Sequence, residues 1–221
     1  MNKKALLAEF IATFVLIFVG VGATASNALT QGNLGLLGIA LAYGLTIAVM
    51  VSATAAVSGG HLNPAVTIGL FFVKKIDAVN AISYIFVQCL GAIAGVFVLQ
   101  QCFPIEYLTA IHMGTPSLAA GVTPGMGLLT EIILTFILVF VIFGTAVDKR
   151  APQVGGLFIG LAITLDILMG GPLTGACMNP ARYLGPALLG GGLQDIWVYW
   201  LGPVLGAIIA AVTYDKFLAK K

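Results

Sequence analysis

Residues 174–187 read TGACMNPARYLGPA, and this stretch decides the fold. At its centre Asn179 precedes Pro180. This pair typically begins a helix, because the Asn side chain caps free N–H groups and proline fits the first helical position, where no N–H is needed. The helix must be short, because Gly185-Pro186 and three glycines at 190–192 follow within about ten residues.

A second stretch, residues 59–73, reads GGHLNPAVTIGLFFV and repeats the pattern. One Asn-Pro-Ala box is a weak signal, because Asn-Pro begins many ordinary turns and helices. Two boxes in corresponding places of a repeated apolar chain are a strong signal. The residues of the two boxes are Asn63, Pro64, Ala65, Asn179, Pro180 and Ala181.

The composition is that of a membrane protein. Of the 221 residues, 60% are hydrophobic and 8% are charged, whereas a soluble domain has roughly 25% charged residues. No charged residue lies between Glu9 and Lys74. The three cysteines have neither paired nor metal-ligand spacing, so we predict no disulfide framework and no metal site. The first apolar run carries Glu9 and lacks a clear cleavage site, which favours an uncleaved first span over a signal peptide.

Eight apolar segments follow one another along the chain. A membrane helix needs about 20 mostly apolar residues, and six segments qualify: 5–25, 34–57, 78–100, 127–147, 154–170 and 195–215. The other two, 63–73 and 179–190, are near ten residues each and would cover about 15 Å of a roughly 30 Å hydrocarbon core. We therefore predict an all-α membrane protein with six transmembrane helices and two re-entrant half-helices.

The basic residues predict the orientation. With six spans and both termini inside, all of them except Arg182 fall on the cytoplasmic side, as the positive-inside rule expects. These residues are Lys3, Lys4, Lys74, Lys75, Lys149, Arg150, Lys216, Lys220 and Lys221. Arg182 stands alone on the opposite half, in the first turn of a buried short helix. An arginine there is energetically costly, and such residues are normally functional.

The two halves of the chain repeat each other. AEFIATF at 8–14 recurs as TEIILTF at 130–136, and Gly91/Gly95 correspond to Gly202/Gly206. Each half has three spans, so the second half is inverted and the two short helices enter from opposite faces. We expect one channel domain over 1–221, with inverted repeats at about 1–102 and 125–221. Small residues four apart allow the helices to pack closely.

The segments before the short helices predict a pore. Irregular backbone at membrane depth is tolerated only where protein buries it or water contacts it, and residues 58–62 and 175–178 read as extended segments without hydrogen-bond partners of their own. Lining a water-filled pore would give their carbonyl groups partners. The residues predicted to contribute these carbonyls are Gly60, His61, Leu62, Gly175, Ala176 and Cys177.

The two helix ends supply the polar chemistry. Each short helix presents about half a positive charge at its N-terminus. With the amides of Asn63 and Asn179 as donors, these ends would hold a passing water molecule by its oxygen, and the same field would repel protons and cations. The pattern predicts a passive conduit for neutral hydrogen-bonding molecules. We see no nucleophile–base pair, and we predict no enzyme, no cofactor and no nucleic-acid partner.

The paired boxes, the Glu-x-x-x-Thr-Phe repeats beginning at Glu9 and Glu131, and HLNPAVT at 61–67 resemble the aquaporin (major intrinsic protein) family over nearly the whole chain. The resemblance implies a right-handed six-helix bundle with two half-helices, one pore per subunit and a homotetramer. It also implies that Glu9 and Glu131 support the re-entrant loops by accepting backbone hydrogen bonds. We expect a multi-pass protein of the cell membrane with both termini cytoplasmic.

The family's aromatic/arginine selectivity filter maps by distance from the boxes onto Tyr43, Ile167, Ala176 and Arg182. Water-specific members usually have His where this chain has Ile167. Glycerol-conducting relatives have Asp directly after the Arg, Lys or Arg four residues later, and Pro-Leu in the sixth span. This chain has Tyr183, Ala187 and Tyr199-Trp200 there and resembles the water-channel side of the family. The Ile and Ala pair also resembles ammonia-permeable members, so ammonia and hydrogen peroxide are further candidate solutes.

Alternatives to a water channel remain open from the sequence. One is a glycerol or small-solute facilitator. Another is a coupled secondary transporter, because inverted repeats and broken helices occur there too, although no coupling-ion site is visible. A third is a scaffold that keeps the fold without conducting. His61 reads as a loop-ordering residue or a pH gate. For Asp166, beside Ile167, the sequence leaves two possibilities open, a contact with solvent at the outer mouth or a pair with Arg182.

Overall fold

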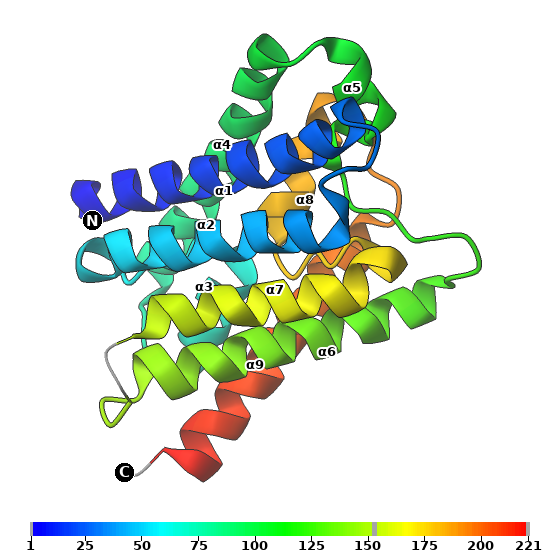
Figure 1. The fold of residues 1–221 in the computed structure, drawn as a ribbon. Coiled ribbons are helices and arrows are strands. Elements are labelled where there is room, and N and C mark those ends of the chain that lie inside the picture. The colour runs from blue at the N-terminus through cyan, green and yellow to red at the C-terminus, as the bar shows by residue number, and fades with distance from the viewer. Residues whose placement is uncertain (1, 152–153, 220–221) are drawn as a thin grey trace.

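The computed structural model describes residues 2–151 and 154–219, and the regular secondary structure in this part of the chain is helix, joined by loops (Figure 1). Six of its helices are long and apolar enough to span a membrane. They are α1 (Lys3–Leu29), α2 (Gly35–Ser58), α4 (Ala78–Cys102), α6 (Pro124–Ile142), α7 (Gly155–Thr174) and α9 (Ile196–Thr213). The last turns of α6 and α9 continue as π-helix to Val147 and Leu218.

Two short helices lie between the spans, in the middle of the bundle (Figure 1). They are α3 (Pro64–Phe72), of 9 residues, and α8 (Pro180–Pro186), of 7 residues. At 1.5 Å per residue they are about 14 and 10 Å long and cannot cross a roughly 30 Å core. Helix α3 packs on α9 and α4, and α8 packs on α4. The prediction of six spans and two half-length helices is confirmed.

Glycines allow the spans to pack at close range. A Cβ at Gly91 of α4 would lie 2.4 Å from the Phe10 carbonyl oxygen of α1, and one at Gly206 of α9 would lie 2.3 Å from that of Ile132 in α6. At Gly160, where α7 meets α2, the distance to the Gly44 carbonyl oxygen would be 2.2 Å. No residue with a side chain fits at these positions. The backbones therefore approach one another as small residues in membrane helices allow.

The helix bounds differ from the prediction at several ends. Helix α7 continues through Pro172 to Thr174, although we expected the span to stop at 170. Proline removes one backbone hydrogen bond, and surrounding protein makes this loss tolerable in a membrane helix. The connection between α4 and α6 also contains a short helix that we did not predict, α5 (Ile105–Ala110), followed by a 3₁₀ turn at His112–Gly114.

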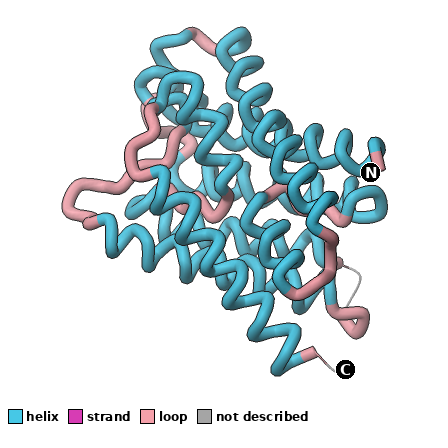
Figure 2. The backbone as a smooth tube through the Cα atoms, turned by 180° about the vertical axis from the view of Figure 1, so that it is seen from behind, coloured by secondary structure: helices cyan, strands magenta, loops and turns pink. Residues whose placement is uncertain are grey.

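The two ends of the chain lie on the same side of the bundle, as both views show (Figures 1 and 2). Lys220 and Lys221, which the orientation argument uses, lie outside the described residues. Large apolar side chains face outward along the spans, for example Leu45, Ile82 and Phe86. This outer surface suits contact with lipid and not with water.

Candidate functional site

Each asparagine of the two boxes caps its short helix. Asn63 and Asn179 have extended backbone, with φ of −153° and −149°, and each is followed by a proline in the first helical position. The Oδ1 of Asn63 accepts a hydrogen bond from the Ala65 N–H at 2.8 Å, and that of Asn179 accepts from Ala181 at 3.0 Å. The predicted helix starts are thus formed as the capping argument requires.

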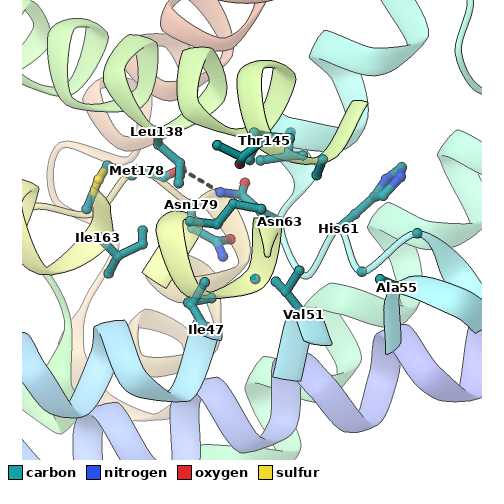
Figure 3. A pocket seen from close by; sticks show the side chains of 18 of the residues that line it. Ile47, Val51, Ala55, His61, Asn63, Leu138, Thr145, Ile163, Met178 and Asn179 are labelled. Carbon is teal, nitrogen blue, oxygen red and sulfur yellow. Dashed lines mark hydrogen bonds between the residues drawn. The ribbon is translucent and has the colours of Figure 1, made fainter. Parts of the chain in front are cut away.

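The same two side chains reach across to the opposite loop. Asn63 Nδ2 donates to the Met178 carbonyl at 2.8 Å (Figure 3). Asn179 Nδ2 donates to the Leu62 carbonyl at 2.9 Å. A side-chain amide has two N–H groups, so each asparagine keeps one N–H that is not used in these contacts. Both side chains line the same cavity. The free N–H groups are therefore available to a molecule inside it.

The loop before α3 is held by Glu9 of α1. The Glu9 carboxylate is fully buried and accepts the backbone N–H groups of His61 at 2.9 Å and Leu62 at 2.7 Å. It also accepts the Ser58 hydroxyl at 2.6 Å and the Gln88 amide at 2.8 Å. Two of its donors are backbone groups that the irregular loop leaves without helical partners. Glu9 therefore makes the contacts that a loop-supporting role requires.

Glu131 of α6 makes the matching contacts to the loop before α8. Its carboxylate accepts the N–H groups of Cys177 at 2.9 Å and Met178 at 2.7 Å, and the Thr174 hydroxyl at 2.6 Å. Ala176 and Met178 have φ of 43° and 54°, a left-handed conformation that is costly for residues other than glycine. The hydrogen bonds to Glu131 hold this strained backbone in place.

A cavity of about 730 Å³ passes between the helices and gathers most of the predicted site residues. All four filter residues line it, with both asparagines. The predicted residues on its wall are Tyr43, Gly60, His61, Asn63, Ile167, Ala176, Cys177, Asn179 and Arg182. The prolines and alanines of the two boxes are not on its wall. They begin the short helices behind the asparagines.

Two predicted pore carbonyls require correction. Leu62 is fully buried and does not line the cavity, and its carbonyl oxygen accepts from Asn179. Gly175 does not line it either, and its carbonyl oxygen accepts from Arg182 Nη2 at 3.1 Å. Both carbonyls bind side chains and so hold the site together. Gly59 and Met178, which we did not predict, are on the wall instead.

Arg182 lies at the wall of the cavity, and two nitrogen atoms of its guanidinium group have no hydrogen-bond partner among the described residues. Its guanidinium carbon is 4.8 Å from the centre of the Tyr43 ring, within range of a cation–π contact. Its Nε and Nη1 atoms are buried and have no hydrogen-bond partner among the described residues. Buried polar groups are rarely left without partners, so water in the cavity is the natural acceptor for these N–H groups.

The wall around the two asparagine amides is apolar. Ile47, Val51, Leu138 and Ile163 surround the two asparagine amides (Figure 3). The sequence reasoning missed these residues, although a signal exists. Positions 43, 47 and 51 of α2, and 159, 163 and 167 of α7, follow one another in steps of four and all line the cavity, so they form one face of each helix. A molecule among these side chains finds hydrogen-bond donors only on the opposite wall.

Charged residues border one end of the cavity. Lys75, Asp148 and Lys149 line it there. Hydrogen bonds from Arg150 hold the pKa of the Asp148 carboxyl well below its ordinary value, so Asp148 is ionised at neutral pH. Arg150 also donates to the Leu218 carbonyl at 3.1 Å, and Lys75 pairs with Asp215 at 3.1 Å. These contacts fasten the connection between α6 and α7, and the end of α3, to the C-terminal turn.

Asp166 is in neither of the two predicted positions. It is buried, with 2% of its surface exposed, and it does not line the cavity. No ion pair joins it to Arg182 in the described residues, and its Oδ2 has no hydrogen-bond partner there. The predictions of a solvent contact at the outer mouth and of a pair with Arg182 were both wrong.

Comparison with known proteins agrees with the fold and with this site. A family model described as "Major intrinsic protein" matches residues 1–214. The chain belongs to this family and is an integral, multi-pass membrane protein. It is 44% identical to "Aquaporin TIP4-4" of Zea mays, with 96% of this chain and 85% of the relative covered. It is also 39% identical to "Aquaporin-4" of Mus musculus, with 96% of this chain and 66% of the relative covered.

A solved structure shares the whole architecture. The aquaglyceroporin from Plasmodium falciparum superposes with a TM-score of 0.88 and 29% sequence identity, over 99% of this chain and 97% of that one. The all-helical aquaporin fold with six spans is thereby confirmed.

Loss of either asparagine side chain should weaken both the loops and the site. We expect Asn63→Ala or Asn179→Ala to reduce the free energy of unfolding by about 1–2 kcal/mol, because a helix cap and a cross-loop hydrogen bond are lost together. Water flux into proteoliposomes should also fall. Asn27→Ala is a matched control, because Asn27 Oδ1 accepts from the Gly35 N–H at 2.8 Å away from the cavity. Normal flux and normal stability in the Asn63/Asn179 double variant would contradict the assignment.

Proposed function

We propose that this protein is a passive channel for water. The observation that carries the proposal is the pair of asparagine amides, each with one uncommitted N–H, side by side and facing apolar side chains in a cavity that runs between the helices. The relatives that the chain resembles are named aquaporins, which supports the same function.

A water molecule that passes the two asparagines would donate hydrogen bonds to neighbouring water molecules and accept hydrogen bonds from the protein. Asn63 and Asn179 donate to the water oxygen, and the apolar side chains opposite accept nothing. The N-terminal ends of α3 and α8, each with about half a positive charge, keep the oxygen turned toward them. This orientation and the positive field oppose the passage of protons and cations. No covalent step is involved, and we propose no enzymatic activity.

The four filter residues are proposed to select the solute. Arg182 supplies free N–H groups and positive charge, while Tyr43 supplies an aromatic wall whose ring centre is 4.8 Å from the guanidinium carbon. Ile167 and Ala176 offer no side-chain donor or acceptor. Such a ring discriminates less against small molecules that make fewer hydrogen bonds than water does. We therefore propose ammonia and hydrogen peroxide as additional solutes and little glycerol.

Ile167→His should sharpen the selectivity for water. A histidine adds a polar contact and narrows the ring, so we expect the flux of ammonia and peroxide to fall relative to that of water. Stopped-flow light scattering on proteoliposomes measures the water flux, and an internal pH or peroxide dye measures the others. Ile167→Leu, which keeps the wall apolar and nearly conserves its volume, should leave the ratio unchanged. Wild-type protein that passes glycerol as fast as water would contradict this view of the filter.

The same preparation tests the channel proposal against its main alternatives. A channel gives water flux proportional to the osmotic gradient, with no dependence on an ion gradient. Flux that saturates or follows a sodium or proton gradient would indicate a coupled transporter. Liposomes that remain as impermeable to water as protein-free ones, with correctly folded protein present, would indicate a scaffold.

The assembly and orientation are also proposals. The exposed apolar faces of the spans and the family resemblance support a homotetramer with one pore in each subunit. The distribution of lysine and arginine supports cytoplasmic termini in the cell membrane. The matching contacts of Glu9 and Glu131 support a single channel domain built from two inverted repeats.

A further inference from the structure

Gly20 of α1 lies against the aromatic ring of Tyr43. A Cβ atom at Gly20 would be 2.1 Å from Cε1 of Tyr43 and 2.5 Å from both Cδ1 and Cζ. Carbon atoms that are not bonded approach to about 3.5–4.0 Å. The space that an alanine side chain would need is therefore occupied by the tyrosine ring. Gly20 is buried within the bundle, where α1 packs against α2.

The ring has one direction in which it can move. Tyr43 is only 2% exposed, although it lines the cavity. Protein interiors are close-packed, so a ring that is displaced from Gly20 finds room only in the cavity. The Arg182 guanidinium borders this space, 4.8 Å from the ring centre. The position of the Tyr43 ring relative to Arg182 thus depends on the missing side chain at position 20.

The second half of the chain lacks this arrangement. Counted from Glu131 as Gly20 is counted from Glu9, the corresponding residue of α6 is Ile142. It lines the cavity itself, together with Ile159 of α7. Two aliphatic side chains line the cavity at these positions. At the Arg182 end, a large ring needs a partner without a side chain.

We propose that Gly20 is a positioning residue that sets the width of the pore at Arg182 by giving the Tyr43 ring a place to lie. This inference rests on the proposed channel function. An alanine at position 20 would push the ring by about 1.5 Å toward the cavity, from the normal carbon–carbon separation. In a pore that passes water in single file, such a shift obstructs the path.

The test compares Gly20→Ala with Gly22→Ala in proteoliposomes. Gly22 is two residues further along the same helix, and a Cβ there would lie 3.3 Å from Cδ2 at the flexible end of Leu99 and 4.0 Å from Cε2 of Phe103. Both substitutions change helix propensity equally. We expect Gly20→Ala to lower the water permeability per channel roughly tenfold or more and Gly22→Ala to leave it unchanged.

Removal of the ring should remove the effect. We expect Gly20→Ala/Tyr43→Ala to conduct water like Tyr43→Ala alone, and the thermal unfolding midpoint to fall with Gly20→Ala only when Tyr43 is present. If Gly20→Ala does not fold, the proposal is still tested by comparing the water flux of the double variant with that of Tyr43→Ala. Equal water flux supports the proposal, and lower flux in the double variant overturns it.

The outcomes separate this inference from the channel proposal. If wild type and Gly22→Ala do not conduct water, the proposed function fails, and the inference that rests on it fails too. If wild type and Gly22→Ala conduct and Gly20→Ala conducts equally well, the channel proposal stands and the role of Gly20 is overturned.

Discussion

Arg182→Val is expected to make the protein leak protons while water flux stays the same or rises. The guanidinium is the one side chain of the proposed filter that carries a positive charge. Its removal lowers the electrostatic barrier to cations and also widens the ring, because valine is smaller. A pH-sensitive dye inside proteoliposomes, with an imposed pH step and potassium and valinomycin to clamp the voltage, should report faster acidification. Water flux is measured on the same vesicles.

The control for this prediction is Arg150→Val. Arg150 is exposed and binds Asp148 and the Leu218 carbonyl, outside the proposed filter. It carries the same charge, so its loss changes the net charge of the protein equally. A proton leak in Arg150→Val would point to a general effect of charge or folding. If Arg182→Val excludes protons as well as wild type does, the positive N-terminal ends of α3 and α8 are sufficient to exclude them, and Arg182 acts only by its size.

Glu131→Leu and Glu9→Leu should have the largest effects on stability. Each removes a buried carboxylate that accepts two backbone N–H groups and at least one side-chain donor. A buried donor without a partner costs about 1–3 kcal/mol, and breaking a buried charged network costs about 3–5 kcal/mol. We expect the free energy of unfolding to fall by about that amount, and most of the protein to be lost on purification in detergent.

Glutamine distinguishes the acceptor role from packing. In Glu131→Gln the side chain keeps its shape, but one oxygen becomes an NH₂ group that faces the Met178 or Cys177 N–H. We expect about 2 kcal/mol of destabilisation, between wild type and Glu131→Leu. The midpoint of thermal unfolding in detergent, measured for wild type, Glu131→Gln and Glu131→Leu, checks this order of stability. Glu106→Gln, on an exposed residue in the first turn of α5, should shift the midpoint little. Equal stability of Glu131→Gln and wild type would contradict the loop-supporting role.

The sequence predicts the architecture because membrane physics limits the choices. Segment length separates six spans from two half-length helices, and Asn-Pro fixes where the short helices begin. Helix ends are less predictable. Helix α6, capped by the Thr123 side chain, begins at Pro124, three residues before the expected start at 127. Helix α7 tolerates Pro172, because neighbouring helices enclose the backbone that the proline leaves without a partner.

The site is predictable only in part, because several of its contacts join residues that are far apart in the chain. Nothing local to Leu62 or Gly175 shows that their carbonyls bind Asn179 and Arg182. Each carbonyl accepts a hydrogen bond from one of these distant side chains, so fewer carbonyl acceptors face the pore than the sequence predicts. The contact between Gly20 and Tyr43 is equally hidden, since glycines in membrane helices are common and most serve packing alone.

The exchanged hydrogen bonds of the two asparagines also bear on how the protein is made. Asn63 binds the carbonyl of a residue 115 positions later in the chain. At about 5–20 residues per second, the ribosome needs on the order of 10 s to add that residue after Asn63. Until then the first re-entrant helix has no partner for its amide. The newly inserted first half must therefore wait in an incomplete state, and the pore can close around its two loops only late in biosynthesis.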